Sequence, residues 1–273
     1  MQVVESHGAK LPALGLGTMT LKQDLCVDIV ATALRQGYRS LDTAQMYENE
    51  TWVGEGLRAS GVSRNEVFVT TKVWRDRLKA SDLEKSVEES LARLKLSVVD
   101  LLLVHWPNDA IPLAETMPAK ARVKRSGLTR HIGVANFTVA MLDEAVRVCD
   151  EPLVTNQIEV HPFLDQTKIL AACRRHGISV TAYCPVARGR VAGNAVLERI
   201  GKAHGKSIGQ VSLRYVVQKG AIPIPRTAKK ERLAENLGVF DFALSAPEMA
   251  ELDGLARPDG RVVSPPFHPA WDV

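Results

Sequence analysis

The sequence lacks several features that mark specialised classes of protein. Its 273 residues include only four cysteines, and none of them forms a C-x-x-C pair, so we expect reduced thiols rather than a disulfide framework. No apolar run approaches the roughly 18 residues that suggest a membrane span. No basic flank followed by a long apolar run opens the chain, so we expect no signal peptide.

The charge of the chain is nearly balanced. Lys and Arg number 35 against 31 Asp and Glu, which gives a formal net charge of +4, and no block of five or more like charges occurs. A nucleic-acid-binding surface would concentrate positive charge more strongly, whereas a modest basic pocket for an anionic ligand is compatible with this distribution. We therefore expect a small molecule as the partner and neither nucleic acid nor a membrane. The scattered cysteines favour a cytoplasmic protein, and we expect it to be a monomer.

Short apolar runs alternate with longer helical patterns along the chain. The run DLLLV is continuously apolar, which is typical of parallel strands that are buried on both faces. No Pro/Gly-rich linker divides the sequence, so we expect one domain over residues 1–273. Eight strand–helix units in this length favour an α/β fold of the TIM type, a (β/α)8 barrel, over an open sheet. The expected strands are Leu14–Gly17, Tyr38–Leu41, Val67–Val73, Val99–Val104, His131–Ala135, Leu153–Val160, Ile178–Tyr183 and Ala221–Pro225.

The two ends of the chain depart from this repeat. VVESHGAKL is expected to form an N-terminal β-hairpin with His-Gly at its turn. Extra C-terminal helices are expected near Lys230–Leu237 and Ala246–Leu255, and the Pro-rich residues 258–273 are expected to be irregular. Within the repeat, Ser81 or Asp82 is the expected N-cap of the helix that ends at Leu94.

Polar residues stand where the expected strands end, which is where barrels of this type carry their active sites. They recur about every 31 residues, the length of one β/α unit. They are Asp42 with Tyr47 shortly after it, Lys72, His105, Asn136, Gln157 with Glu159, Tyr183 and Arg226.

Each of these residues also has an ordinary structural interpretation. An Asp after a strand often caps a helix, a single Lys is usually solvated, and a His beside a Trp is more often packed than catalytic. Together they indicate chemistry, because Lys72 ends a buried strand and needs an anion, which Asp42 on the adjacent strand supplies. A cation beside Tyr47 is expected to lower the pKa of its phenol from about 10 and to make it a usable proton donor.

Seven motifs follow one another along nearly the whole chain, namely GYRSLDTAQMYENETWVGEGL, FVTTKVW, DLLLVHWP, IGVANF, NQIEVHP, VTAYCP and IPRTAKKERLAEN. In this order they resemble the signatures of the aldo-keto reductases. The sequence as a whole, with its short tail PPFHPAWDV, resembles the bacterial 2,5-diketogluconate reductase branch. The resemblance implies a (β/α)8 barrel that binds NADPH in an extended conformation without a Rossmann domain. GLGTMT is accordingly not interpreted as a dinucleotide loop, since it lacks the third glycine.

The resemblance implies a catalytic tetrad made of Asp42, Tyr47, Lys72 and His105. Tyr47 would protonate the carbonyl oxygen as the nicotinamide delivers hydride to the carbonyl carbon. Lys72, paired with Asp42, would tune Tyr47, and His105 would orient the carbonyl. The substrate would meet Met19, Tyr47, Trp74, His105 and Trp106.

The cofactor site implied by the resemblance draws on several strand ends. Asn136 and Gln157 would bind the nicotinamide carboxamide, and Tyr183 would stack on the ring. Arg226, Thr227 and Arg232 would hold the 2′-phosphate, with Glu235 and Asn236 near the adenine. The full set is Gly17, Thr18, Asp42, Asn136, Gln157, Tyr183, Arg226, Thr227, Arg232, Glu235 and Asn236. The alternative for the run Lys229–Arg232 is a solvated helix face, but barrels often bind phosphate after their last strands.

Three positions depart from the family pattern. Ala135 stands where a Ser commonly precedes the Asn, Arg226 where many members have Lys, and Met19 where many have an aromatic residue in the substrate pocket. Trp74 and Trp106 remain as apolar walls of that pocket, and the alternative is that both are only core aromatics.

The sequence thus predicts an NADPH-dependent reductase of small aldehydes or ketones, with keto sugars and dicarbonyls as candidate substrates. The alternatives are a cofactor-binding regulatory subunit with the same fold and a metal-dependent barrel hydrolase or isomerase. Glu159 and His161 lie close together, but no H-E-x-x-H or other metal spacing occurs, so no catalytic metal is expected.

Overall fold

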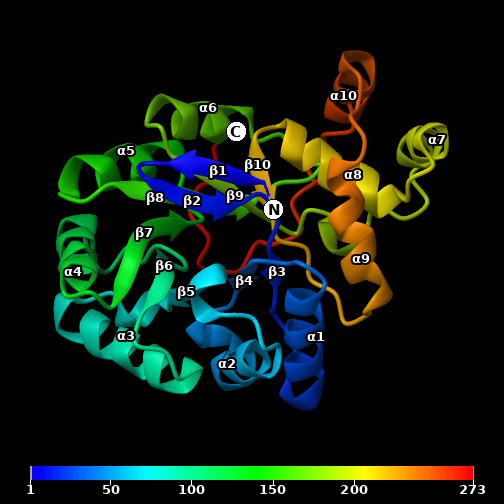
Figure 1. The fold of residues 1–273 in the computed structure, drawn as a ribbon. Helices are drawn as coiled ribbons and strands as arrows, with labels where there is room; N and C mark the ends of the chain where they lie inside the picture. Colours follow the sequence, from blue (N-terminus) through cyan, green and yellow to red (C-terminus); the bar gives the residue numbers. More distant parts are fainter. Residues whose placement is uncertain (1, 273) are drawn as a thin grey trace.

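Eight parallel strands with helices around them make up the centre of the molecule in the computed structural model, which describes residues 2–272 (Figure 1). The strands are β3 (Leu16–Gly17), β4 (Ser40–Asp42), β5 (Phe68–Val73), β6 (Val99–Val104), β7 (Thr129–Ala135), β8 (Leu153–Glu159), β9 (Ser179–Tyr183) and β10 (Ala221–Pro223). The helices are α1 (Gln23–Arg35), α2 (Glu50–Ala59), α3 (Ala80–Leu94), α4 (Leu113–Arg125), α5 (Val139–Val148), α6 (Thr167–Arg175), α7 (Ala195–His204), α8 (Ile208–Gln218), α9 (Glu231–Leu237) and α10 (Ala246–Asp253).

The sheet closes on itself because its first and last strands meet. The strands pair in chain order from β3 to β10, and the backbone N–H groups of Gly15 and Gly17 donate to the carbonyls of Pro223 and Pro225, at 3.0 and 3.1 Å. Only glycine fits at position 17, since a Cβ there would lie 2.8 Å from the carbonyl oxygen of Ile224. The expected (β/α)8 barrel is confirmed.

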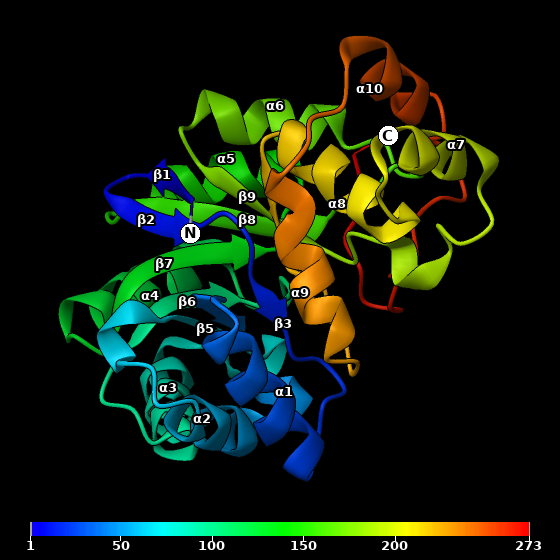
Figure 2. The ribbon, with the colours of Figure 1, turned by 45° about the vertical axis from the view of Figure 1, so that its right-hand side comes forward.

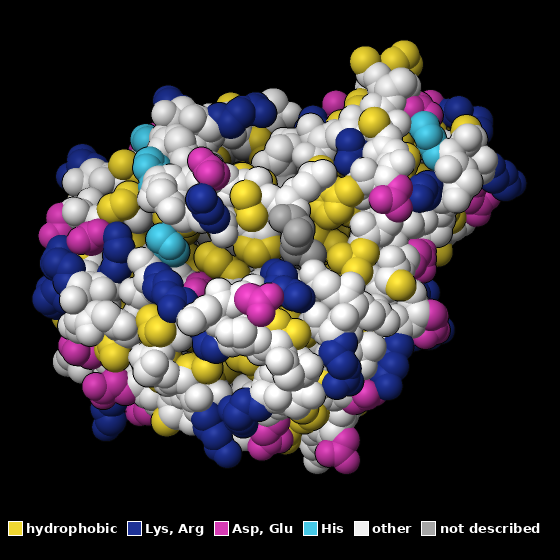
Figure 3. Space-filling view, viewed as in Figure 1, with side chains coloured by type: hydrophobic (Ala, Val, Ile, Leu, Met, Phe, Trp, Pro, Cys, Tyr) yellow, Lys and Arg dark blue, Asp and Glu magenta, His cyan; other side chains and the backbone are white. Residues whose placement is uncertain are grey.

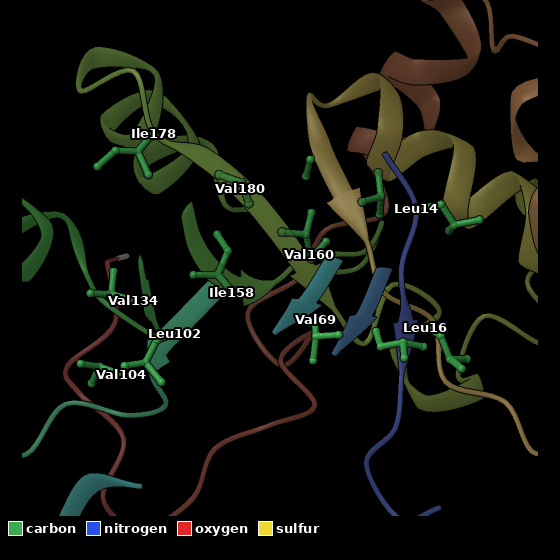
Figure 4. Packing of buried hydrophobic residues seen from close by; sticks show 14 of the residues in the cluster. Leu14, Leu16, Val69, Leu102, Val104, Val134, Ile158, Val160, Ile178 and Val180 are labelled. Atoms are coloured by element: carbon green, nitrogen blue, oxygen red, sulfur yellow. The ribbon is translucent and has the colours of Figure 1, made fainter. Parts of the chain in front are cut away.

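Alternate residues of each strand serve two different cores. Leu102 and Val104 of β6 face the helices and join the large apolar cluster shown in part in Figure 4. Leu101 and Leu103 lie instead in a small cluster with Ala135, Val154 and Ile222, and with Ala9 and Leu11 of the hairpin. This second cluster fills the barrel, as expected for strands whose side chains alternate between two faces. His105 follows Leu101 and Leu103 at the next position of the same inward row.

The N-terminal hairpin consists of β1 (Val3–Ser6) and β2 (Ala9–Pro12), joined at His7 and Gly8, which both have positive φ as the expected turn requires. In Figure 1 the blue hairpin lies in front of the barrel and the red C-terminal segment passes behind it. After the turn of the view in Figure 2 the two separate, with the hairpin at the left and the red segment at the right. The hairpin thus covers one end of the barrel and the C-terminal segment the other.

One helix cap and several strand ends differ from the expectation. Strand β3 begins at Leu16 rather than Leu14, β7 begins at Thr129 rather than His131, and β10 ends at Pro223 rather than Pro225. Helix α3 begins at Ala80, so its N-cap is Lys79 and neither Ser81 nor Asp82, which both lie inside the first turn. Strand β4 begins at Ser40 rather than Tyr38, because Gly37 (φ 110°) turns the chain and the Tyr38 N–H donates back to Ala33. Ser207 and Ser245 form capping boxes at the starts of α8 and α10.

The surface mixes charges of both signs. On the face shown in Figure 3, Lys and Arg side chains are interspersed with Asp and Glu. Within residues 2–272, no helix combines the length and the apolar character needed to cross a membrane.

Candidate active site

A buried ion pair lies at the C-terminal ends of β4 and β5. Lys72 is completely buried, and its Nζ donates to Asp42 Oδ1 at 2.5 Å and to the Thr43 carbonyl at 2.9 Å. Gln157 on the far side of the barrel donates its amide to the other carboxylate oxygen, Asp42 Oδ2, at 2.7 Å. Both charges are therefore paired and hydrogen-bonded, which is the condition under which a protein tolerates a buried ion pair.

Tyr47 reaches the same point from a short 3-10 turn, Gln45–Tyr47. Its hydroxyl lies 3.3 Å from Lys72 Nζ, and the ammonium lies 4.8 Å from the centroid of the phenol ring. The turn is held by side chains on both flanks. Lys22 Nζ donates to the Tyr47 carbonyl at 2.7 Å, and the Gln45 carboxamide bonds Ser86 and the backbone N–H of Trp74.

The protonation states of the site follow from burial and from this pair. Burial raises the pKa of the Tyr47 phenol, and the positive charge of Lys72 opposes this without reversing it. The lowered pKa expected from the sequence is therefore wrong: Lys72 does lower the pKa of Tyr47, but burial raises it by more. Burial lowers the pKa of Lys72, but Asp42 and Tyr47 outweigh it and the net direction is upward. At neutral pH the site thus holds a protonated phenol beside an ammonium.

His105 follows β6 and lies between Tyr47 and Trp74, with ring-centroid distances of 5.5 and 5.2 Å and nearly perpendicular planes. Burial and the charge of Lys72 lower the pKa of His105 well below its usual value, so the imidazole is neutral. Its Nδ1 is buried and has no hydrogen-bond partner among residues 2–272. A neutral imidazole keeps one donor and one acceptor, and either can serve a ligand.

The residues expected at the nicotinamide form one hydrogen-bonded chain. Asn136 has a left-handed backbone (φ 63°), which Asn tolerates, and its amide donates to the His105 carbonyl at 2.9 Å. Tyr183 donates its hydroxyl to Asn136 Oδ1 at 2.8 Å. One N–H of the Gln157 amide bonds Asp42, so the side-chain oxygen of Gln157 and the second N–H groups of Gln157 and Asn136 remain for a ligand.

The residues expected at the phosphate end lie just after β10. Arg226 and Arg232 are exposed, and neither pairs with a carboxylate within residues 2–272. Thr227 is buried, and its hydroxyl accepts from the Lys229 N–H at 3.0 Å, which fixes the loop between the two arginines. Glu235 and Asn236 follow on α9, half-buried, with Glu235 accepting a hydrogen bond from Ser207.

Gly17 and Thr18 lie between these two ends at the barrel seam. The Thr18 hydroxyl is fully buried and donates to the Asp42 carbonyl at 2.9 Å, so in this structure Thr18 braces the strand that carries Asp42. Gly17 permits the close approach of the loop after β10 that carries Arg226.

A cluster of aromatic side chains adjoins His105 through Trp74, and the sequence analysis did not name two of its members. Trp74 and Trp106 were expected, and both rings contact Phe267 edge-on, at 5.7 and 5.6 Å between centroids. Trp271 contacts Trp106 at 6.0 Å. Met19, which follows Thr18 in the chain, is 37 % exposed. Phe267 and Trp271 are two aromatic residues in a Pro-rich tail, and this is the feature by which they could have been noticed. Hydrophobic periodicity does not predict where an irregular tail lies.

The comparisons with known proteins agree with this geometry. The model of the Aldo/keto reductase family matches residues 13–257. The chain belongs to the aldo/keto reductase family. It is accordingly an NADPH-dependent oxidoreductase that acts on carbonyl groups, as the sequence predicted, and not the cofactor-binding subunit kept as an alternative.

Among its relatives in the aldo/keto reductase family, methylglyoxal reductase DkgB of Escherichia coli O157:H7 is 41 % identical over 96 % of this chain and 99 % of its own length. Glyoxal reductase of Bacillus subtilis is 38 % identical over 94 % of this chain and 92 % of its own. A crystal structure assigned to a 2,5-diketo-D-gluconic acid reductase B superposes with a TM-score of 0.98, is 46 % identical, and covers all of this chain and 98 % of its own. These similarities confirm the expected branch of the family.

Proposed function

We propose that this aldo/keto reductase reduces one carbonyl of small α-dicarbonyl compounds, the class of methylglyoxal and glyoxal, with Tyr47 as the proton donor. The observation that carries the proposal is the phenol of Tyr47, which remains protonated, 3.3 Å from the Lys72 ammonium and beside the neutral His105. The names of the DkgB and glyoxal reductase relatives support the substrate class.

The residues present fit NADPH. Asn136 and Gln157 offer one donor and one acceptor, which matches a carboxamide, and Tyr183 offers a ring beside them. Arg226 and Arg232 offer guanidinium groups free of carboxylates, the groups that bind phosphate in a bidentate manner. When bound, NADPH supplies the hydride that reduces the carbonyl carbon.

The chain itself manages the proton and the negative charge on oxygen. His105 donates a hydrogen bond to the carbonyl and orients its oxygen toward Tyr47. As negative charge develops on that oxygen, the Tyr47 phenol gives up its proton, and the Lys72 ammonium stabilises the phenolate that remains. Asp42 and Gln157 hold Lys72 in place. Proton donation of this kind contributes roughly 10²–10⁴-fold to rate.

The aromatic enclosure favours small substrates. Trp74 and Trp106 both contact Phe267 edge-on, and Trp74 also contacts the ring of His105, so large apolar rings lie on one side of the site. Planar, compact carbonyl compounds fit such walls better than long-chain aldehydes or steroids do.

A substrate panel tests the proposal. Oxidation of NADPH is followed by absorbance with methylglyoxal, glyoxal, 2,5-diketogluconate and a long-chain aliphatic aldehyde, and the products are identified. We expect the highest kcat/KM for the small dicarbonyls and a hydroxy-carbonyl product. Turnover of none of them by a protein that binds NADPH would contradict the proposal, and a preference for the long-chain aldehyde would contradict the substrate class.

We further propose that residues 1–273 act as one barrel domain, as a monomer and in the cytoplasm. Size-exclusion chromatography with light scattering, which should give the mass of a single 29.9 kDa chain, tests the oligomeric state. Residues 1 and 273 lie outside the part that the structure describes.

A further inference from the structure

Glu159, at the C-terminal end of β8, carries a buried carboxylate that the proposed reaction does not use. It is completely buried and accepts three hydrogen bonds, from His161 Nε2 at 2.8 Å and from the backbone N–H groups of Val262 and Val263 at 2.6 and 2.9 Å. His161 Nδ1 accepts from the Phe163 N–H, so the ring proton lies on Nε2 and is donated to Glu159. The pair is therefore an anchor for a segment about a hundred residues further along the chain.

The anchored segment runs across the mouth of the barrel. Phe267, a few residues beyond Val263, inserts between Trp74 and Trp106, which follow β5 and β6, and the Arg75 guanidinium lies 4.6 Å from the centroid of its ring. Further along, Asp272 Oδ2 accepts from the Val139 N–H at the start of α5. The segment is thus tied at β8, packs over β5 and β6, and is tied again after β7.

The tie at Glu159 ends four residues before Phe267 and helps to fix where Phe267 begins its approach, together with the bond from the Arg257 N–H to the Phe163 carbonyl. A buried carboxylate is costly unless its oxygens are satisfied, and here two of its three donors belong to the segment itself. A carboxamide in its place would keep one acceptor oxygen but would turn an NH2 group toward N–H donors. The position of Val262 and Val263, and with it that of Phe267, depends on the charge of Glu159.

We propose that Glu159 is a positioning residue for substrate binding: it tethers the C-terminal segment and so sets where Phe267 closes the pocket against Trp74 and Trp106. The proposal rests on the carbonyl-reductase function proposed above. A change at Glu159 should therefore alter KM rather than kcat. Glu159 bonds neither Tyr47 nor Lys72, because Lys72 bonds Asp42 and Tyr47 instead.

The test combines three variants with a matched control. Glu159→Gln removes the negative charge, and Phe267→Ala removes the ring that packs against Trp74 and Trp106. Val263→Pro removes one N–H donor and leaves Glu159 intact, so the test stays valid if Glu159→Gln fails to fold. Asp259→Asn, on the exposed part of the same segment, is the control. We expect KM for methylglyoxal to rise about tenfold, or ~1.4 kcal/mol, in Glu159→Gln and Val263→Pro, with kcat and the NADPH Kd within about twofold of wild type.

Two further readouts separate this proposal from a general loss of structure and from the proposed function. If Glu159 acts through Phe267, Glu159→Gln adds little to KM in the Phe267→Ala background. Limited trypsin digestion, which needs no turnover, should cut at Arg261 faster in Glu159→Gln and Val263→Pro than in wild type or Asp259→Asn. An unchanged KM in the folded variants, full additivity with Phe267→Ala, or unchanged cleavage at Arg261 would overturn the tether. If the wild type reduces no dicarbonyl but cleavage still responds, the proposed function fails and the tether stands as a structural contact only.

Discussion

Replacing Lys72 by Met tests the ion pair at the centre of the site. The substitution keeps the length of the side chain but leaves the buried Asp42 carboxylate without its cation at 2.5 Å, with Gln157 as its remaining side-chain donor. Breaking a buried pair in this way costs about 3–5 kcal/mol, and the bond from Gln157 puts the expected loss near the lower end, about 3 kcal/mol. For a chain of this size that lowers Tm by roughly 6–12 °C.

Activity should fall further than stability. Tyr47 would lose the only ammonium near its hydroxyl among the described residues, so nothing would offset the effect of burial on its pKa or stabilise its phenolate. We expect kcat to fall by at least about 10²-fold, measured by initial rates at saturating NADPH and methylglyoxal.

A double variant separates the two effects. Asp42→Asn in the Lys72→Met background removes the unpaired charge, so it should recover about half of the lost stability, measured by urea denaturation, without recovering activity. A Lys72→Met protein that is as stable and as active as wild type would refute the reasoning.

Three other outcomes are expected. Between pH 6 and 9, kcat should vary by less than about twofold, because the pKa of Tyr47 is raised and that of His105 is lowered well below its usual value; a midpoint near pH 7 would contradict these states. Burial lowers the pKa of Lys120 on α4 to about 7. Between about pH 7 and 10 Lys120 is therefore protonated in the unfolded chain but not in the folded one, so its contribution makes the free energy of unfolding rise with pH. Lys120→Met should therefore stabilise the protein at pH 6 by about 2 kcal/mol or more and flatten this rise, as urea denaturation at several pH values would show. Arg232→Ala should lower the ratio of the NADH Kd to the NADPH Kd by about tenfold, while Arg122→Ala should leave this ratio unchanged. Equal affinities of the wild type for NADPH and NADH would refute the assignment of Arg232 to the 2′-phosphate.

The barrel and the pairing of Asp42 with Lys72 could be predicted because both follow from short-range patterns. Continuous apolar strands and helical spacing define the repeat, and a polar residue at the end of each strand must face the same mouth once the sheet closes. Asp42 and Lys72 meet for this reason, although they are 30 residues apart.

The features that the sequence did not predict depend on burial and on long-range contacts. Lys120 lies in the charged stretch KARVKR, which is typical of a solvated helix face, yet its side chain is buried against the Gly133 carbonyl. The direction of the Tyr47 pKa shift depends on how deeply the ring is buried, and spacing carries no such information. Phe267 and Trp271 lie in an irregular segment whose position is set by Glu159, more than a hundred residues earlier.

The most direct test of the central claim is to measure NADPH binding and methylglyoxal reduction together in Tyr47→Phe. The phenylalanine ring keeps the packing against His105, while the hydroxyl that lies 3.3 Å from Lys72 is lost. The account predicts that Kd for NADPH, followed by quenching of tryptophan fluorescence, stays within about twofold of wild type while kcat falls by roughly 10²–10⁴-fold. A Tyr47→Phe protein that keeps more than half of the wild-type kcat would contradict it.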